Sequence, residues 1–167
     1  ILKYSISAYM CLLFTANANA IEIKVSNGEE LTEAISKVKP GDRIVMSNGI
    51  WKDTAIDFNA NGASKDSIFL EAETAGKVIL SGNSSLKLSG DYLVAKGLWF
   101  KDGYSKFVIS FMNKKKVATN SRVTNCAITD YNPETKAESN HWVELWGKNN
   151  RFDNNYIAGK TNDGCTL

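Results

Sequence analysis

Two side chains with the chemistry to hold a ligand lie close together near the end of the chain, in the segment HWVELWGK. Trp146, which strand alternation places outward, can stack on the ring of a bound molecule, or a loop can cover it instead. His141, the only histidine, can contact a ligand or be a structural residue that its neighbours satisfy. The same alternation predicts that Val143 and Leu145 point into the core.

Three more polar side chains flank this segment. Lys160 follows Gly159 in a turn, where its ammonium can pair with a carboxylate. Lys148 also lies in a turn and is a weaker candidate, because turn lysines are usually only solvated. Tyr131, in the preceding stretch, is a further candidate contact. The predicted binding set is therefore His141, Trp146, Lys148, Lys160 and Tyr131.

Short strands separated by polar turns must position these side chains. The pattern predicts strands over 143–146, 151–153 and 155–158, each too short to form a sheet alone. Similar strands recur upstream at a spacing of 29 residues. The spacing aligns Val94 with Val123 and Phe152, Trp99 with Ile128 and Ile157, and Gly97 with Cys126 and Asn155.

This repetition predicts an all-β fold, a right-handed parallel β-helix in which strands of successive coils pair about 4.8 Å apart. Short apolar triplets can also align by chance, which is the alternative to a true repeat. Asn125, Asn154 and Asn155 lie beside the predicted bends, where stacked amides can hydrogen-bond from one coil to the next.

The start of the mature chain predicts a cap for this solenoid. Residues 21–25 alternate as a strand, and an amphipathic helix follows through GEELTEAISKVKPGD. Asn27 is the predicted N-cap, Glu29 and Glu30 suit the first turn, and Pro40-Gly41 ends the helix. Such a helix would cover the open end of a solenoid. At the other end a strand begins near Cys165 without a capping helix, so we expect the solenoid to be truncated there.

Residues 1–20 have the pattern of a signal peptide. Lys3 precedes an apolar run, and Ala18-Asn19-Ala20 provides the small residues that a signal peptidase reads. We therefore expect export, to the periplasm or outside the cell, and a mature domain over 21–167.

Composition argues against several classes of partner. Without Lys3 the chain has 19 basic and 18 acidic residues, so no bulk charge draws it to nucleic acid or membrane. A polyanion would have to be recognised locally, and the run Lys114 to Lys116 is either a solvated loop tip or such a contact. Cys126 and Cys165 fall at inward-looking positions and are expected to be buried free thiols, with a disulfide as the alternative. Two cysteines and one histidine make a poor metal site.

An ordered set of motifs resembles polysaccharide lyase family six, which comprises alginate lyases and chondroitinase B-type dermatan sulfate lyases. The motifs are VKPGDRIVMSNGIWKD (38–53), GKVILSG (76–82), LVAKGLWFKDG (93–103) and HWVELWGKNNRFDNNYIAGK (141–160). The resemblance implies cleavage of an acidic uronate polysaccharide, alginate first, by β-elimination. If the resemblance holds for the ligand as well, Trp146 would stack on a sugar ring and Lys160 would pair with a uronate carboxylate.

The resemblance also implies Ca²⁺, held by an Asn and two Glu, with a Lys as base and an Arg assisting the leaving oxygen. A divalent cation stabilises the dianion that forms when a proton beside a carboxylate is removed. The family motifs that carry these residues have no counterpart here, so the catalytic Lys and Arg and the calcium ligands are expected beyond Leu167. Glu144 matches a different family position, and no metal role is transferred to it.

Two alternatives to an alginate lyase stay open. A chondroitinase B-type dermatan sulfate lyase would share the fold, and a non-catalytic β-helix that binds carbohydrate would explain the missing catalytic set. The oligomeric state does not follow from the sequence.

Overall fold

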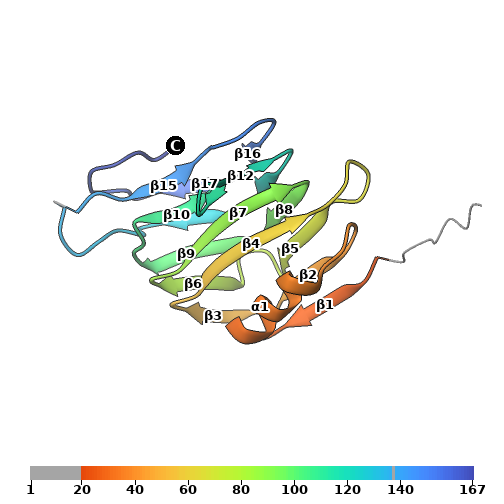
Figure 1. Ribbon diagram of the computed structural model, residues 1–167. Coiled ribbons are helices and arrows are strands. Elements are labelled where there is room, and N and C mark those ends of the chain that lie inside the picture. The colour runs from red at the N-terminus through yellow and green to blue at the C-terminus, as the bar shows by residue number, and fades with distance from the viewer. Residues whose placement is uncertain (1–19, 137) are drawn as a thin grey trace, which may run out of the picture.

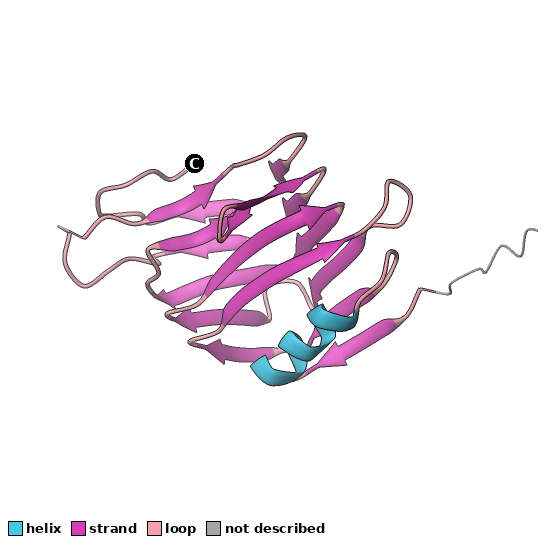
Figure 2. Cartoon of the chain, in the orientation of Figure 1, coloured by secondary structure: helices cyan, strands magenta, loops and turns pink. Residues whose placement is uncertain are grey.

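The computed structural model describes residues 20–136 and 138–167. Figures 1 and 2 show short strands stacked in layers, with one helix at the end where β1 lies. The predicted leader lies outside the described residues except for Ala20.

The elements follow one another in a repeating order of three strands per coil. The helix is α1 (Gly28–Lys37). The first nine strands are β1 (Glu22–Val25), β2 (Arg43–Met46), β3 (Gly49–Lys52), β4 (Ala55–Asn61), β5 (Ile68–Ala72), β6 (Val78–Gly82), β7 (Ser85–Asp91), β8 (Leu93–Lys96) and β9 (Leu98–Gly103). They continue as β10 (Phe107–Ser110), β11 (Met112–Asn113), β12 (Lys116–Thr119), β13 (Arg122–Thr124), β14 (Ala127–Thr129), β15 (His141–Glu144), β16 (Arg151–Asp153) and β17 (Tyr156–Ala158).

Three sheets run along the solenoid axis. The first sheet has the order β1-β2-β5-β8-β13-β16, and the second has the order β17-β14-β9-β6-β3. The third sheet contains β7, β10, β12 and β15, with β4 paired to β7. The pairings between coils are parallel, and the antiparallel pair β11–β12 is a local hairpin. The predicted parallel β-helix is therefore confirmed (Figure 1).

The core is made of side chains stacked in columns, one from each coil. Strand registers define one column per sheet, and its members are buried except in the last coil, where Phe152 and Ile157 are half-buried. The columns are Ile44, Leu70, Ala95, Val123 and Phe152 in the first sheet, Trp51, Leu80, Phe100, Ile128 and Ile157 in the second, and Ile56, Leu86, Ile109 and Val143 in the third.

Two of the columns predicted from the 29-residue spacing, those of Val123 and Ile128, begin one residue later in the chain than predicted. Val123 pairs with Ala95, not Val94, and Ile128 pairs with Phe100, not Trp99. The step between these coils is thus 28 residues, whereas the next step, from Val123 to Phe152, is 29 as predicted. A shift of one residue turns a side chain to the opposite face of a strand, so Val94 and Trp99 point outward.

Asparagines lie at the bends, as predicted, but among Asn125, Asn154 and Asn155 only the Asn155 side chain bonds to the preceding coil within the described residues. Asn125 and Asn154 have φ values of 53° and 54°, a left-handed conformation that asparagine tolerates well. Asn155 Oδ1 accepts a hydrogen bond from the Cys126 amide at 2.8 Å, and its Nδ2 donates to the Val123 carbonyl at 3.0 Å. One side chain therefore ties two consecutive coils together.

The capping helix is confirmed. Asn27 Oδ1 accepts from the Glu30 amide at 2.9 Å, and Glu30 in turn accepts from the Ser26 amide at 2.7 Å. Leu31 and Ala34 are buried against the first coil, so α1 closes that end of the solenoid (Figure 2).

Two predictions about the last strands were wrong. Leu145 was expected in the core but is 49% exposed, because β15 ends at Glu144 and alternation ends with it. Cys165 was expected to be buried but is exposed, since it lies outside the strands. Cys126 is a buried free thiol, as predicted, and desolvation raises its pKa to about 12.

Candidate functional site on the outer face of the third sheet

The outer face of the third sheet carries a row of polar side chains that crosses four coils. Strand registers place Asp57 beside Lys87, Lys87 beside Ser110, and Ser110 beside Glu144. Their neighbours along each strand point into the core, so the row faces outward. Ser110 Oγ donates to Glu144 Oε2 at 3.3 Å.

A hollow of about 360 Å³ lies beside this row. Lys87 and Lys106 line it together with Tyr104 and Phe107. Within the described residues neither ammonium has a carboxylate within 4.0 Å, and the Lys106 Nζ lies 5.7 Å from the Phe107 ring centroid. Burial raises the pKa of Tyr104, and the neighbouring Glu138 raises it further. The hollow therefore combines two free cations, a neutral phenol and an aromatic face.

His141 extends the face toward β15. Its ring centroid lies 5.4 Å from that of Phe107, and its Nδ1 lies 3.4 Å from Glu144 Oε1. The Cys165 Sγ is 3.0 Å from the same Nδ1. His141 thus lies beside the polar row, with Glu144 and Cys165 at its Nδ1 and the ring of Phe107 next to its own, and its ligand contact stays a prediction.

Trp146 lies just beyond the end of β15 and is 47% exposed. Its indole N–H points to Glu144 Oε2 at 3.5 Å, so the ring stays next to the polar row. Nearly half of the side chain is thus open to solvent, and stacking of Trp146 on a ligand ring stays a prediction.

Lys160 does not have the predicted geometry for a ligand carboxylate. Its Nζ lies 2.9 Å from Asn140 Oδ1 and from the Asn162 carbonyl, and 3.0 Å from Asn162 Oδ1 and from the Asp163 carbonyl. An ammonium has three protons, and these four oxygens use them. Desolvation lowers the Lys160 pKa. Lys160 therefore holds a turn together.

Tyr131 is also structural, contrary to the prediction. Its side chain is 0% exposed. The hydroxyl lies 2.6 Å from the Gly82 carbonyl, to which it donates, and accepts from the Ser84 amide at 2.8 Å. Desolvation raises its pKa to about 12. A ligand cannot reach this side chain because the Gly82–Ser84 turn and the ring of Phe100 enclose it.

Lys148 is an exposed turn residue. Its backbone carbonyl accepts from the Asn120 amide at 3.0 Å, which fixes the turn. Its side chain makes no hydrogen bond or ion pair with the described residues. The structure brings His141 and Trp146 together, and leaves Lys148 at the next bend.

Sequence reasoning missed Lys87, Lys106, Tyr104 and Phe107. The alternation of SLKLS does place Lys87 outward, and this signal was available. Tyr104 and Lys106 lie on the connection before β10, and Phe107 is the first residue of that strand, so only the coil register brings them beside Lys87.

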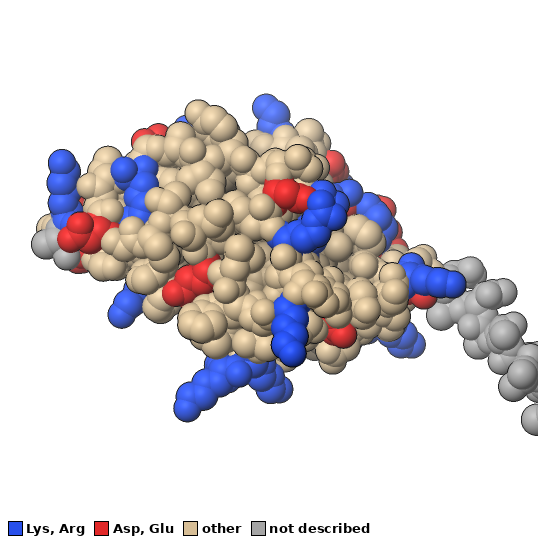
Figure 3. All heavy atoms as spheres, turned by 90° about the horizontal axis from the view of Figure 1, so that it is seen from above, with Lys and Arg blue, Asp and Glu red and all other residues tan. Residues whose placement is uncertain are grey.

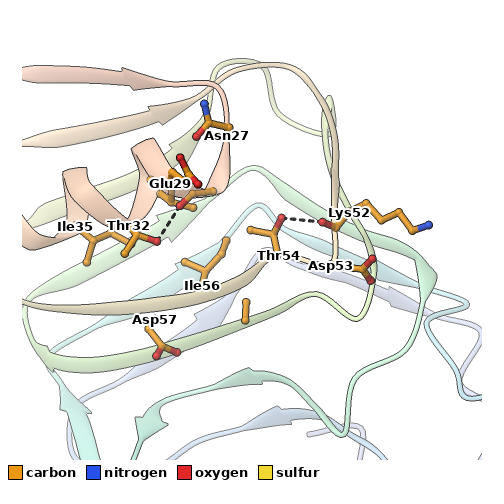
Figure 4. A pocket seen from close by; sticks show the side chains of 12 residues that line it. Asn27, Glu29, Thr32, Ile35, Lys52, Asp53, Thr54, Ile56 and Asp57 are labelled. Atoms are coloured by element: carbon orange, nitrogen blue, oxygen red, sulfur yellow. Dashed lines mark hydrogen bonds between the residues drawn. The ribbon is translucent and has the colours of Figure 1, made fainter.

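A larger cavity, of about 620 Å³, lies between α1 and the segment 52–57 (Figure 4). Its walls carry the carboxylates of Glu29, Asp53 and Asp57, against one lysine, Lys52. The carboxylates repel an anionic ligand, so the smaller hollow at Lys87 and Lys106 is the better anion site.

Charge on the face seen from above (Figure 3) is mixed. Seen from above, basic and acidic side chains are interspersed without one large field of a single sign (Figure 3). The net charge is only +2. An anionic ligand would therefore have to be attracted by local groups such as Lys87 and Lys106.

The described residues do not fit a calcium site. Within 20–136 and 138–167, no group of three or more His, Cys, Asp or Glu side chains is placed to hold a metal ion. Glu144 is a single carboxylate that already contacts Ser110, and His141 beside it is not an oxygen ligand of the kind that calcium prefers.

No helix in residues 20–136 and 138–167 is long and apolar enough to cross a bilayer.

Comparison with known proteins decides the family. The family model of chondroitinase B matches residues 25–167. The chain belongs to polysaccharide lyase family six, the chondroitinase B family. This confirms the family that the motifs predicted. The comparison with curated proteins gave no match.

Solved structures of family-six lyases have the same fold as this family-six chain. The alginate lyase AlyGC is 42% identical, with a TM-score of 0.83 over 84% of this chain and 20% of that chain. Pedsa3628 from Pseudopedobacter saltans is 40% identical, with a TM-score of 0.78 over 84% and 32%. A mannuronic acid specific family-six lyase from human gut microbiota is 30% identical, with a TM-score of 0.77 over 85% and 35%. The chain thus spans a fifth to about a third of the length of these relatives.

Proposed function

We propose that the protein is a polysaccharide lyase that cleaves a uronate-containing polysaccharide, with alginate as the first substrate, and that it holds the polymer on the outer face of the third sheet. The observation that carries the proposal is the 42% identity to an alginate lyase over most of the chain. The structural neighbours at 40% and 30% identity are also family-six lyases.

The chemistry of the face supports a uronate ligand. The free ammonium groups of Lys87 and Lys106 suit carboxylates, and the rings of Phe107 and Trp146 suit the apolar faces of pyranoses. Glu144 adds a carboxylate that can accept hydrogen bonds from sugar hydroxyls, and the buried Ser110 hydroxyl donates to this carboxylate. The ligand contact predicted for His141 belongs to the same face.

In this proposal, residues 20–167 bind and orient the polymer and do not transfer protons. Calcium assistance is an expectation from the family resemblance, and the ion would neutralise the uronate carboxylate. Its ligands, the catalytic Lys and the catalytic Arg are expected beyond Leu167. No step of β-elimination is assigned to the side chains described above.

A second candidate substrate is dermatan sulfate. The matching family model carries the name chondroitinase B, which favours this glycosaminoglycan as the alternative. Export of the protein is part of the same proposal, because the sequence pattern of residues 1–20 is that of a signal peptide.

Absorbance of the unsaturated uronate product tests the proposal. The full-length protein is assayed on alginate and on dermatan sulfate, each with and without added calcium. We expect product from alginate. The K87A/K106A double variant should raise KM for the polymer about five- to ten-fold, because two charge contacts are lost, whereas K65A in the loop between β4 and β5 should not change it. Oligouronide binding with no product from either polymer would instead favour a non-catalytic binding protein.

A further inference from the structure

A second face of the solenoid carries an outward row of apolar side chains. In the second sheet the strand registers align Ile50, Ile79, Trp99, Ala127 and Tyr156, one from each coil. The two ends of the row are open to solvent, with Ile50 73% and Tyr156 65% exposed. This row lies on a different sheet from Lys87 and His141.

The row is hollowed at Ala127. Ala127 pairs with Trp99 on one side and with Tyr156 on the other, so a small side chain lies between two aromatic ones. A groove of about 470 Å³ opens there. Trp99 and Tyr156 are two coils apart, which is about 10 Å at the spacing of paired strands. This is close to the length of two pyranose rings in an extended chain.

Trp99 is held in place before any ligand arrives. Its indole N–H donates to Thr129 Oγ1 at 2.8 Å, and the Lys101 ammonium lies 4.9 Å from its ring centroid. A ring that is already fixed loses little conformational entropy on binding. Lys101 also places a cation beside the groove, although Asp102 lies 3.9 Å from it.

Polar groups line the rim of the same groove. Asn125 and Asn154 border it, and their side chains make no hydrogen bond to the described residues. Side-chain amides offer both donors and acceptors, which match sugar hydroxyls. Two aromatic walls, a small floor and free amides together form a site for a pyranose.

We infer that this groove is a second glycan-binding site, in which a uronate polysaccharide lies across Ala127 between Trp99 and Tyr156. The polymer class follows from the proposed function, but the site is separate from the third-sheet face and takes no part in cleavage. This second site would keep the protein bound to the polymer while the outer face of the third sheet holds the segment that is cleaved.

The test measures retention of the full-length protein in native gels that contain alginate. The K87A/K106A background removes the two lysine contacts of the third-sheet face, so a larger share of the remaining retention comes from the groove. Ala127→Trp fills the hollow from outside the core, and Tyr156→Ala removes one wall. Each substitution should weaken the apparent affinity for alginate about five- to ten-fold, the first by blocking the groove and the second by removing an aromatic contact. Ile50→Ala is the matched control, in the same row but outside the groove, and should bind as its parent.

Retention unchanged by Ala127→Trp and Tyr156→Ala would overturn the inference. So would sedimentation showing self-association that Ala127→Trp abolishes, because the face would then be an interface between copies of the chain. Product formation is recorded in parallel. If the full-length protein forms product but the groove variants keep their retention, only the groove is rejected. If the groove variants lose retention but the protein forms no product from either polymer, the lyase proposal is rejected and the groove is kept.

Discussion

Lysines on this solenoid are distinguished by what their ammonium groups touch. Lys160 has four oxygen atoms within 3.0 Å and stabilises a turn. Lys87 and Lys106 have no such partners among the described residues and border a hollow beside an aromatic ring. A free cation in a hollow can exchange water for a ligand carboxylate, whereas a saturated one cannot do so without losing its own hydrogen bonds.

Tyr131→Phe tests the structural role of the buried phenol. The substitution leaves the Ser84 amide without its acceptor, so we expect a loss of about 1–3 kcal/mol in the free energy of unfolding. Urea denaturation measures the loss. Tyr156→Phe, on an exposed side chain, should stay within about 0.5 kcal/mol of the wild type. Equal stabilities of the Tyr131→Phe variant and the wild type would contradict the role assigned to this hydroxyl.

The sequence was a good guide to side chains whose role depends on a single strand, and a poor one to those whose role depends on neighbouring coils. Val143 was placed in the core correctly by its own strand, and Trp146 is exposed as expected although β15 ends before it. Tyr131 was misplaced, because its partners at Gly82 and Ser84 are 47 to 49 residues away. Lys106 and Phe107 were missed for the same reason.

At the scale of elements, register decides which residues form the core. The cap helix was predicted in full because its signals, from Asn27 to Pro40-Gly41, are local. The one-residue difference between coils was not visible, since Val94 and Ala95 are adjacent and both apolar. Only the pairing of strands from separate coils distinguishes them.

Paired substitutions test this register. Val123→Asp places a carboxylate in the buried column between Ala95 and Phe152, so we expect a loss of more than about 4 kcal/mol or failure to fold. Val94→Asp is the matched control on the outward side of its strand and should cost less than about 1 kcal/mol. Thermal unfolding followed by circular dichroism gives both values. Comparable losses would mean that the two valines share one interior.

The cap of α1 should make stability sensitive to acid. Hydrogen bonds from Ser26 lower the pKa of Glu30 below its ordinary 4.5, so the folded state favours the carboxylate. This contribution is present at neutral pH and is lost as the pH falls from about 5 toward 3. As the pH falls across that range, the urea concentration at the midpoint of unfolding should decrease less steeply for Glu30→Gln than for the wild type.

Glu29→Gln is the control for this measurement, because the Glu29 side chain makes no hydrogen bond within the described structure. It should keep the wild-type pH dependence. An equal change in both variants would show that the helix dipole, which acts on both side chains, causes the effect rather than the Ser26 contacts.

For the whole molecule, the solenoid separates its tasks by face. Stacked inward columns form the core, and the outward rows face the solvent. The third sheet carries the lysines and aromatic rings of the proposed polymer site, and the second carries the hollow at Ala127. Because the net charge is only +2, local groups on these faces must provide the attraction for an acidic chain.

Lysine acetylation footprinting of the full-length protein with alginate oligosaccharides is the most direct test of the central claim, that the outer face of the third sheet binds the polymer. We predict that oligosaccharide slows the acetylation of Lys87 and Lys106 and leaves the acetylation of Lys65 unchanged. Unchanged acetylation of Lys87 and Lys106 at saturating oligosaccharide, with protection elsewhere on the solenoid, would contradict it.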